Sequence, residues 1–477
     1  MEWNEILSLD EKAEIEFKSA KTKIPLSFYE TYSAFANTKG GTIFLGIKEN
    51  EKAPHVLEGV ENAKAKRKQL FDALLNKSKV SVCLCKEEDI EIIPSPKGDI
   101  IRVHVNEADA KDKPVYLNGD IRESYFRNDS GDHLLLEEQI ESFLNDKSEV
   151  RFDSKANQIS AEIEDLDQES LALFLQEIKD AGKLPSASGL NPEKILMRIG
   201  AFAKSREDNE YKLTNGAILF LGKSADIASI CPSLWLDFQV QSEFGERFAD
   251  RITNKDLICE GNIFQFFYRS IGKAFASAPS PFFVDGGKDV GRAKMQKMLR
   301  EAFANALSNL DLFDTKGLRI QSDARGITFT NAGTMLVPYE IALTGGVSRP
   351  RNPTIFAFFQ ALGISDRGGY GIPFIFDAAD ELSLLAPRLI ERKETNETIL
   401  RIHYLPRRNR KSEEETKILN LLSAERNYLS ILEIANKTGL GRDKTRRAVE
   451  LLLLEGLLED NGKTTKGRAY RLSSKES

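Results

Sequence analysis

A helix end that runs into a glycine pair and then a strand constrains the fold of this chain more than any other segment. Residues 34–38 read Ala-Phe-Ala-Asn-Thr, and Gly40-Gly41 follow after one lysine. Glycine is the residue that tight turns favour, because it adopts backbone angles that other residues avoid. Residues 42–47, Thr-Ile-Phe-Leu-Gly-Ile, then have the composition of a buried strand. The segment therefore predicts a helix, a tight turn and a strand in an N-terminal domain that mixes both element types.

An acidic stretch lies just upstream of this segment. In residues 14–18, Glu-Ile-Glu-Phe-Lys, polar and apolar side chains alternate, which is the period of a half-buried strand. Glu14, Glu16 and Lys18 are therefore expected on one face. Carboxylates and an amine beside a turn are suited to bind a metal ion or a nucleic acid.

Plainer interpretations of the same residues remain open. Ser8 and Glu11 fit a helix capping box, which would account for Glu11. Glu16 and Lys18 fit a surface ion pair on an edge strand, worth about 0.5 kcal/mol. The glycine pair would then be only a turn.

The combination of Glu11, residues 16–18 and residues 34–41 resembles the Schlafen AlbA-like domain. The resemblance implies a nucleic-acid-binding domain over residues 1–145. It also carries Glu11 and Glu16 onto two acidic nuclease positions of that family, and Glu49 onto the third, with Glu51 as an alternative.

In that reading, Glu11, Glu16 and Glu49 are the candidate catalytic and metal-binding carboxylates. Clustered carboxylates repel one another unless a cation neutralises them, and Mg²⁺ or Mn²⁺ suits a site made of oxygen ligands. Such an ion activates water against a phosphodiester, while Lys18 stabilises charge that develops on the phosphate. The alternative is that the domain binds nucleic acid without cutting it.

The composition sets outer limits on the class of protein. A chain of 477 residues, of which 41% are hydrophobic and 29% charged, holds about three globular domains. No apolar run approaches the roughly 20 residues of a membrane span, and the acidic N-terminus is unlike a signal peptide. Four cysteines without metal or disulfide spacing favour a reducing cytoplasm, and only four histidines make a histidine-based metal site improbable.

The charge is distributed unevenly along the chain. The net charge is −6, but residues 401–477 contain 17 basic and 11 acidic residues. A basic tail on an acidic body favours contact between the tail and a polyanion. A helical module with a solvated charged surface is the alternative.

Residues 415–475 resemble a winged helix-turn-helix. Helices are expected over 416–422, 430–438 and 442–454, followed by a hairpin. The resemblance places the third helix in the DNA major groove and the hairpin on the backbone. The candidate nucleic-acid-binding residues on these two elements are Arg442, Lys444, Arg446, Arg447, Lys463, Lys466 and Arg468. Modules of this kind also dock proteins or form dimers.

A second resemblance covers residues 285–405. Glu301 and Asn305 are four residues apart on a helix whose other face is apolar, and a glycine-rich stretch follows downstream. This order resembles the GHKL-ATPase-like C-terminal portion of RecG-related proteins. The resemblance implies that Glu301 activates water, that Asn305 binds magnesium and that a lid with Gly368, Gly369 and Gly371 holds the phosphates of ATP.

One departure from that family bears on the base of the nucleotide. The sequence Asn331-Ala332-Gly333 stands where the family has Asp-x-Gly, and the aspartate accepts a hydrogen bond from the adenine amino group. Its loss predicts weakened ATP binding and makes ATP hydrolysis improbable. The plainer interpretation is an amphipathic helix with flexible loops beside it.

The remaining segments complete a multidomain α+β architecture. Residues 160–280 are expected to form an α/β connecting domain with strands over 216–221 and 234–240. A strand is expected over 80–84, and the polar residues 145–157 are interpreted as a linker. No Gly-x4-Gly-Lys-Ser/Thr loop occurs, so a helicase motor is rejected.

Three functions fit this architecture. The first is a DNA-binding regulator or defence-associated factor, tuned by a small ligand near Glu301. The second is a metal-dependent endoribonuclease that cleaves structured RNA such as tRNA in defence against phage. The third is an assembly subunit that forms a homo-oligomer.

Overall fold

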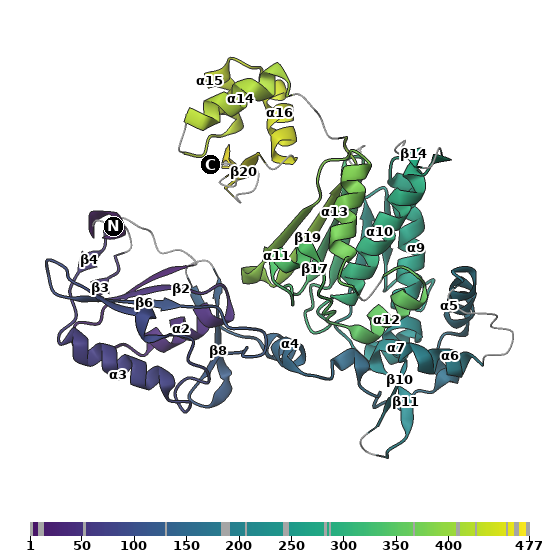
Figure 1. The fold of residues 1–477 in the computed structure, drawn as a ribbon, viewed down its shortest axis with the longest axis horizontal. Coiled ribbons are helices and arrows are strands. Elements are labelled where there is room, and N and C mark those ends of the chain that lie inside the picture. The colour runs from purple at the N-terminus through teal and green to yellow at the C-terminus, as the bar shows by residue number, and fades with distance from the viewer. Residues whose placement is uncertain are drawn as a thin grey trace.

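The computed structural model describes most of the chain. The described residues are 3–7, 14–50, 54–128, 131–182, 191–205, 208–241, 248–280, 284–285, 288–365, 368–406, 411–424, 427–454, 457–461 and 467–473. Figure 1 shows an N-terminal domain, a larger middle region and a C-terminal module. The α+β multidomain architecture expected from the sequence is confirmed.

The N-terminal domain is built on a four-stranded sheet with the strand order β1-β2-β6-β5. Strands β1 and β2 are parallel, and the other pairs are antiparallel. A second sheet, β7-β8-β9, packs beside it. The elements are α1 (Trp3–Leu7), β1 (Ile15–Lys18), α2 (Ser27–Asn37), β2 (Gly41–Leu45), β3 (Ile47–Lys48), β4 (Val56–Leu57), α3 (Ala63–Leu75), β5 (Ile90–Ile93), β6 (Ile100–Val105), β7 (Tyr116–Leu117), β8 (Asp120–Asn128), β9 (Gly131–Leu134) and α4 (Glu137–Lys147).

Residues 43–45 of strand β2 are all apolar and buried, because both faces of the strand are covered there. Ile43 and Leu45 point into the core that contains α2 and α3, whereas Phe44 packs with Phe17 in a smaller core on the other face. The alternation predicted for β1 therefore holds, since Phe17 is buried in this smaller core and Glu16 and Lys18 contact each other.

The glycine pair before β2 is a steric requirement. Gly40 has a φ of +76°, and a Cβ atom there would lie 2.6 Å from the carbonyl oxygen of Val105. A Cβ at Gly41 would lie 2.6 Å from the ring of Phe35. The turn thus lets helix α2 approach the sheet closely.

The middle region is organised around a six-stranded sheet with the order β13-β12-β16-β17-β19-β18. Helices α9, α10 and α13 cover one face, and the opposite face is turned toward the other two parts of the molecule (Figure 1). The elements are α5 (Gln168–Asp180), α6 (Pro192–Ile199), β10 (Phe202–Lys204), β11 (Tyr211–Leu213), α7 (Asn215–Leu221), α8 (Ser224–Ile230), β12 (Leu236–Val240), β13 (Asp250–Thr253), α9 (Ile263–Ser277), β14 (Val284–Asp285), β15 (Lys288–Asp289), α10 (Gly291–Ser308), β16 (Leu318–Asp323), β17 (Gly326–Ala332), α11 (Tyr339–Thr344), α12 (Pro353–Ala361), α13 (Gly371–Glu381), β18 (Arg388–Arg392) and β19 (Glu397–His403).

Two strands expected from the sequence are absent from the described residues. Residues 216–221 lie in helix α7, because the Thr214 hydroxyl caps the helix by accepting the N–H of Ala217 at 3.1 Å. The whole segment is buried, so its apolar run carried no period that separates strand from helix. In residues 80–84, only Val80 makes a β-bridge, to Leu117.

The segment interpreted as a linker, residues 145–157, is instead a buried junction. Asp153 is fully buried and accepts the N–H groups of Thr354 and Ile355 at 2.7 and 3.1 Å, which lie in the first turn of α12. Asp146 pairs with Arg351. Polar residues that look solvated in the sequence are therefore the groups that fasten the N-terminal domain to the middle region.

The C-terminal module contains three helices and a two-stranded antiparallel sheet around its own apolar core. Its elements are α14 (Glu413–Ala424), α15 (Ile431–Thr438), α16 (Arg442–Leu454), β20 (Leu458–Asp460) and β21 (Tyr470–Leu472). The third helix has the predicted bounds. No helix among the described residues has the length and apolar character needed to cross a membrane.

The junction generates a prediction about pH. Burial raises the pKa of Asp153 to about 6, so the folded protein holds this proton more tightly than the unfolded chain does. The stability contribution of protonated Asp153 is complete below about pH 4 and is lost as the pH rises through about 6. We therefore expect the stability of the natural protein relative to Asp153→Asn to fall between about pH 4 and 7, by up to about 3 kcal/mol, in urea unfolding experiments.

Asp180→Asn, on the exposed end of α5, is the matched control and should show no such trend. If the free energies of unfolding of Asp153→Asn and the natural protein differ by a constant amount over this pH range, the raised pKa of Asp153 is contradicted.

Candidate functional site

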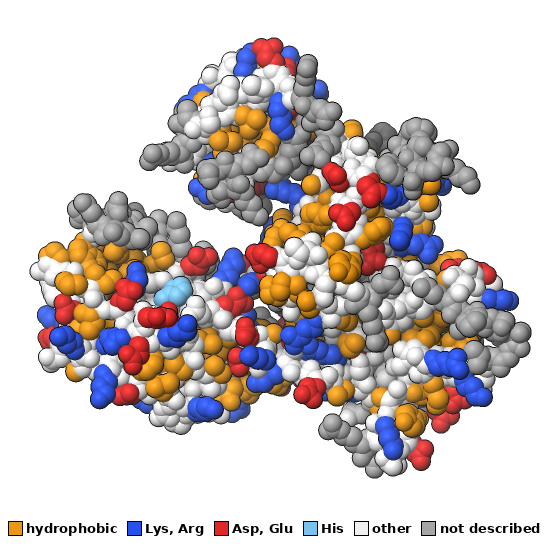
Figure 2. All heavy atoms as spheres, viewed as in Figure 1, with side chains coloured by type: hydrophobic (Ala, Val, Ile, Leu, Met, Phe, Trp, Pro, Cys, Tyr) orange, Lys and Arg blue, Asp and Glu red, His pale blue; other side chains and the backbone are white. Residues whose placement is uncertain are grey.

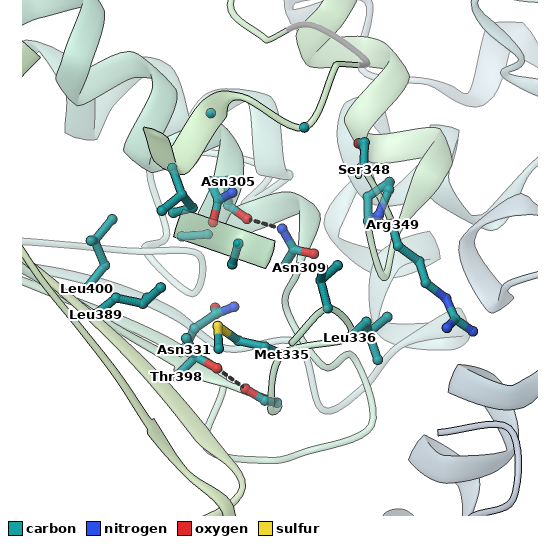
Figure 3. A pocket seen from close by; sticks show the side chains of 18 of the residues that line it. Asn305, Asn309, Asn331, Met335, Leu336, Ser348, Arg349, Leu389, Thr398 and Leu400 are labelled. Atoms are coloured by element: carbon teal, nitrogen blue, oxygen red, sulfur yellow. Dashed lines mark hydrogen bonds between the residues drawn. The ribbon is translucent and has the colours of Figure 1, made fainter. Parts of the chain in front are cut away.

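One candidate site is a pocket between helix α10 and the sheet of the middle region (Figure 3). Together with the solvent in its mouth it has a volume of about 1060 Å³. This is the size range of sites for drug-sized ligands and cofactors. The structure brings Glu301, Asn305, Gly369 and Gly371, all singled out in the sequence, to this one pocket.

Helix α10 supplies the polar wall. Glu301 is buried, and its Oε1 accepts a hydrogen bond from the Ser365 hydroxyl at 3.0 Å. A Cβ atom at Gly371 would lie 2.4 Å from the same oxygen, so glycine as the first residue of α13 leaves room for the carboxylate in its present position. Asn305 lies one turn further along α10 and also lines the pocket.

Two glycine-containing segments close the pocket beside this wall. Gly369 has a φ of +70°, and a Cβ there would lie 2.3 Å from the carbonyl oxygen of Val347. Gly345, with a φ of +78°, lies against the Tyr370 ring. Gly368 also contacts that ring, but it is not among the residues that line the pocket. The backbones of these two segments thus lie close to each other. Close backbone packing at glycines is a feature of loops that bind phosphate groups.

The floor is formed by the sheet and is mostly apolar. Leu389 and Leu400 lie on neighbouring strands, and Asn331 and Thr398 lie opposite each other on β17 and β19 (Figure 3). The Thr398 hydroxyl donates to the carbonyl oxygen of Gly333 at 2.8 Å.

Asn331 stands out because it is only 6% exposed and its Oδ1 has no hydrogen-bond partner. A buried polar atom without a partner is costly, and most are satisfied by water or a ligand. The sequence argument treated Asn331 as the loss of an acceptor. An amide oxygen is itself an acceptor, but Oδ1 of Asn331 is buried and makes no hydrogen bond. Weakened ATP binding stays a prediction.

The pocket is attached to the domain junction. Arg351 donates to the carbonyl oxygens of Asn309 and Thr334, both at 3.0 Å, and these two residues line the pocket. The same guanidinium binds both carboxylate oxygens of Asp146 on α4, at 2.9 and 2.8 Å. One buried arginine therefore positions a pocket wall and the N-terminal domain together.

In the N-terminal domain, Glu16 lies in a buried ion-pair cluster. Its Oε2 accepts from Arg127 at 2.7 Å, and its Oε1 accepts from Lys18. Arg127 is 1% exposed, lies over the Phe35 ring and binds Asp132 at 2.8 Å. The cations that neutralise Glu16 in this structure are thus protein side chains.

The rest of the predicted carboxylate cluster is not assembled by the described residues. Glu49 is exposed after β3, and Glu11 lies outside the described residues. Within the described part of the chain, no three histidine, cysteine, aspartate or glutamate side chains come close enough to hold a metal ion. Metal binding by Glu11, Glu16 and Glu49 remains a prediction.

The residues just before the glycine pair have a structural role that the sequence analysis missed. Asn37 donates to the carbonyl oxygens of Val115 and Tyr125, each at 2.9 Å, and the Thr38 hydroxyl accepts the N–H of Arg127 at 2.9 Å. These bonds fix strand β8 against α2, and so they position Arg127 beside Glu16. None of the motifs singled out in the sequence includes this arginine.

Helix α16 exposes the predicted basic residues. Arg442, Lys444, Arg446 and Arg447 are exposed, whereas Ala448, Val449 and Leu452 are buried in the core of the module. Lys463 and Lys466 lie outside the described residues. Arg468 is described, and its guanidinium is paired with Asp460 at 2.6 Å.

Comparison with known protein families gives matches for the N-terminal domain and for part of the middle region. Residues 11–136 match the Schlafen AlbA_2 family model, and residues 318–400 match the model named "Putative ATP-dependent DNA helicase recG C-terminal". Residues 141–237 match a domain of unknown function, DUF8451. The chain therefore carries a Schlafen AlbA_2 domain and a RecG-type C-terminal domain, both from nucleic-acid-related families, as the resemblances predicted.

The solved structures that are similar to this chain include the following two. The DIP2311 protein from Corynebacterium diphtheriae is 16% identical, with 98% of this chain and 95% of that chain covered and a TM-score of 0.42. The N-terminal domain of a helicase RecG-related protein from Nitrosomonas europaea is 26% identical, with 29% of this chain and 95% of that chain covered and a TM-score of 0.23. No curated protein matches the chain.

The buried cluster generates a prediction about stability. Arg127→Met would leave Glu16 and Asp132 buried with less compensating charge, so we expect a loss of about 3–5 kcal/mol in urea unfolding. Arg122→Met removes an exposed pair with Asp120 on the same strand and should lower the free energy of unfolding far less than Arg127→Met does. Equal losses for the two variants would show that the cluster does not stabilise the domain.

Proposed function

We propose that the protein is a nucleic-acid-binding regulator whose C-terminal module is a winged helix-turn-helix that holds duplex DNA. The observation that carries the proposal is the distribution of side chains on α16. Four basic residues are exposed in its first two turns, and the apolar stripe packs inward on α14 and α15. A recognition helix has this arrangement, with its N-terminal residues presented to the base edges.

The contacts of α16 with the middle region support this orientation. Glu450 pairs with Arg325 at 3.0 Å, and the carbonyl oxygen of Leu453 accepts from Arg388 at 2.8 Å. Both contacts involve the C-terminal half of the helix. Its N-terminal turns, which carry the basic residues, are therefore left open to a duplex.

The charge distribution on the N-terminal domain suggests that this domain contributes less to DNA affinity than the C-terminal module does. On the face shown in Figure 2, the described basic and acidic side chains of this domain are interspersed. Mixed charge gives a weaker attraction for a polyanion than a patch of one sign does. We therefore assign most of the phosphate contacts to the C-terminal module.

DNA binding is tested with fluorescence anisotropy on duplex DNA at several salt concentrations. The double variant Arg446→Ala with Arg447→Ala should bind more weakly, and the slope of log K against log salt should become shallower by about one to two units. Each lost phosphate contact removes roughly 0.9 of a unit.

Lys194→Ala with Arg198→Ala is the matched control, because it removes the same charge from exposed positions on α6. An unchanged slope in the α16 variant, or an equal change in the control, would contradict the proposal.

The N-terminal domain is proposed to bind nucleic acid without cutting it, because Glu16 is already neutralised by Lys18 and Arg127. Incubation of the protein with total tRNA and labelled DNA, in Mn²⁺ or in EDTA, tests this. We expect salt-dependent shifts and no products. Cleavage that EDTA blocks and that Glu16→Gln abolishes, in a variant whose thermal unfolding shows it to be folded, would establish the endoribonuclease instead.

A further inference from the structure

The middle sheet has an open face that neither the DNA contact through α16 nor the family matches explain. Helices α9, α10 and α13 cover the other face, and alternate residues of each strand point away from them (Figure 1). The side chains on the open face, taken strand by strand across the sheet, are Arg251 and Thr253, Asp237 and Gln239, Arg319, Gln321 and Asp323, Thr328, Thr330 and Ala332, Glu397, Ile399, Arg401 and His403, and Arg388, Ile390 and Arg392.

The open face has an excess of positive charge, because it carries five arginines against three carboxylates. Two of the carboxylates are already neutralised, since Asp237 pairs with Arg251 at 2.9 Å and Asp323 pairs with Arg401 at 3.1 Å. The third is Glu397, at the start of β19. A surface with uncompensated positive charge attracts a polyanion.

Three of the arginines have donors to offer such a partner. Arg319 and Arg392 are exposed, and no described residue forms an ion pair or a hydrogen bond with either side chain. Arg388 uses Nη1 on the carbonyl oxygen of Leu453, and a guanidinium has four further N–H donors. Arg319 lies on β16, three strands away from Arg388 and Arg392 on β18, which is about 14 Å at the usual strand spacing.

The space between these arginines favours a duplex over a single strand. Single strands are bound by stacking of bases on aromatic side chains, and none of the described side chains on the open face is aromatic. Thr328, Thr330 and Ile399 lie between the arginines, and none of them carries a charge. The major groove of B-DNA is about 12 Å wide, so arginines about 14 Å apart can contact phosphates on its two sides.

We propose that the open face is a second binding surface for duplex DNA, on which Arg319 contacts phosphates on one side of a groove and Arg388 and Arg392 contact those on the other. The proposal rests on the proposed DNA binding and deepens it. Helix α16 contacts the rim of the same face, where Glu450 pairs with Arg325 in the turn between β16 and β17. A duplex held by α16 therefore has a basic surface beside it.

The experiment is fluorescence anisotropy of the full chain with duplex DNA at several salt concentrations. Arg319→Gln with Arg392→Gln should make the slope of log K against log salt shallower by about one to two units, because two phosphate contacts are lost. Phosphate contacts carry no sequence information, so affinity should fall by a similar factor on two duplexes of unrelated sequence.

Two further variants separate contact with DNA from other effects. Arg292→Gln with Lys297→Gln removes the same charge from exposed positions on α10, on the other side of the sheet, and should leave the slope unchanged. Thr330→Lys adds a charge between Arg319 and Ile399 and should steepen the slope by about one unit. Thermal unfolding checks that each variant is folded.

The proposal is overturned by an unchanged slope in the Arg319 and Arg392 variant, by an equal change in the α10 control, or by an unchanged slope in Thr330→Lys. An unchanged slope together with an altered sedimentation coefficient would assign the open face to a second copy of the chain, which also overturns it. The α16 variant is measured in the same series. If only that variant changes the slope, the open face fails and the winged helix stands; if only the open-face variant does, the reverse holds.

Discussion

The structure depends on the buried ion pair between Arg351 and Asp146. Arg351 is 2% exposed, and besides the carboxylate it binds two backbone carbonyl oxygens of the pocket wall. Burial alone would lower the pKa of Arg351, but Asp146 more than offsets this and holds it above its ordinary value. Pairs of this kind tolerate removal of one partner poorly, because the other is left as an uncompensated buried charge.

The same arginine explains the glycine that follows β17. Gly333 has a φ of +103°, and a Cβ atom there would lie 2.2 Å from Arg351 Nη1. The glycine in the Asn331-Ala332-Gly333 sequence therefore makes room for the guanidinium. Gly333, which belongs to the segment that the family resemblance connects with nucleotide binding, thus also makes room for the arginine that attaches the N-terminal domain.

Local patterns predicted the elements whose period is unambiguous. The alternation at β1 and the apolar stripe of α16 were sufficient for those two elements. Helix α7 was mistaken for a strand because every residue in it is buried. The junction at residues 145–157 was mistaken for a linker because its polar side chains find partners about 200 residues away, which no local window contains.

The candidate sites divide in the same way. Glu301 and Asn305 were predictable because one helical turn places them on a common face, and the glycines were visible as a cluster. Arg127 was not predictable as the partner of Glu16, since 111 residues separate them. The unpaired Oδ1 of Asn331 depends on which hydrogen bonds its neighbours make, and only coordinates reveal those.

The attachment of the C-terminal module has a mechanical consequence. The described polar contacts that join it to the sheet, Arg325 with Glu450 and Arg388 with the carbonyl oxygen of Leu453, engage partly exposed side chains. Exposed pairs are worth about 0–1 kcal/mol each, close to thermal energy. The C-terminal module can therefore rotate relative to the pocket at little cost, whereas the N-terminal domain, which buried charges attach, moves with the pocket as one piece.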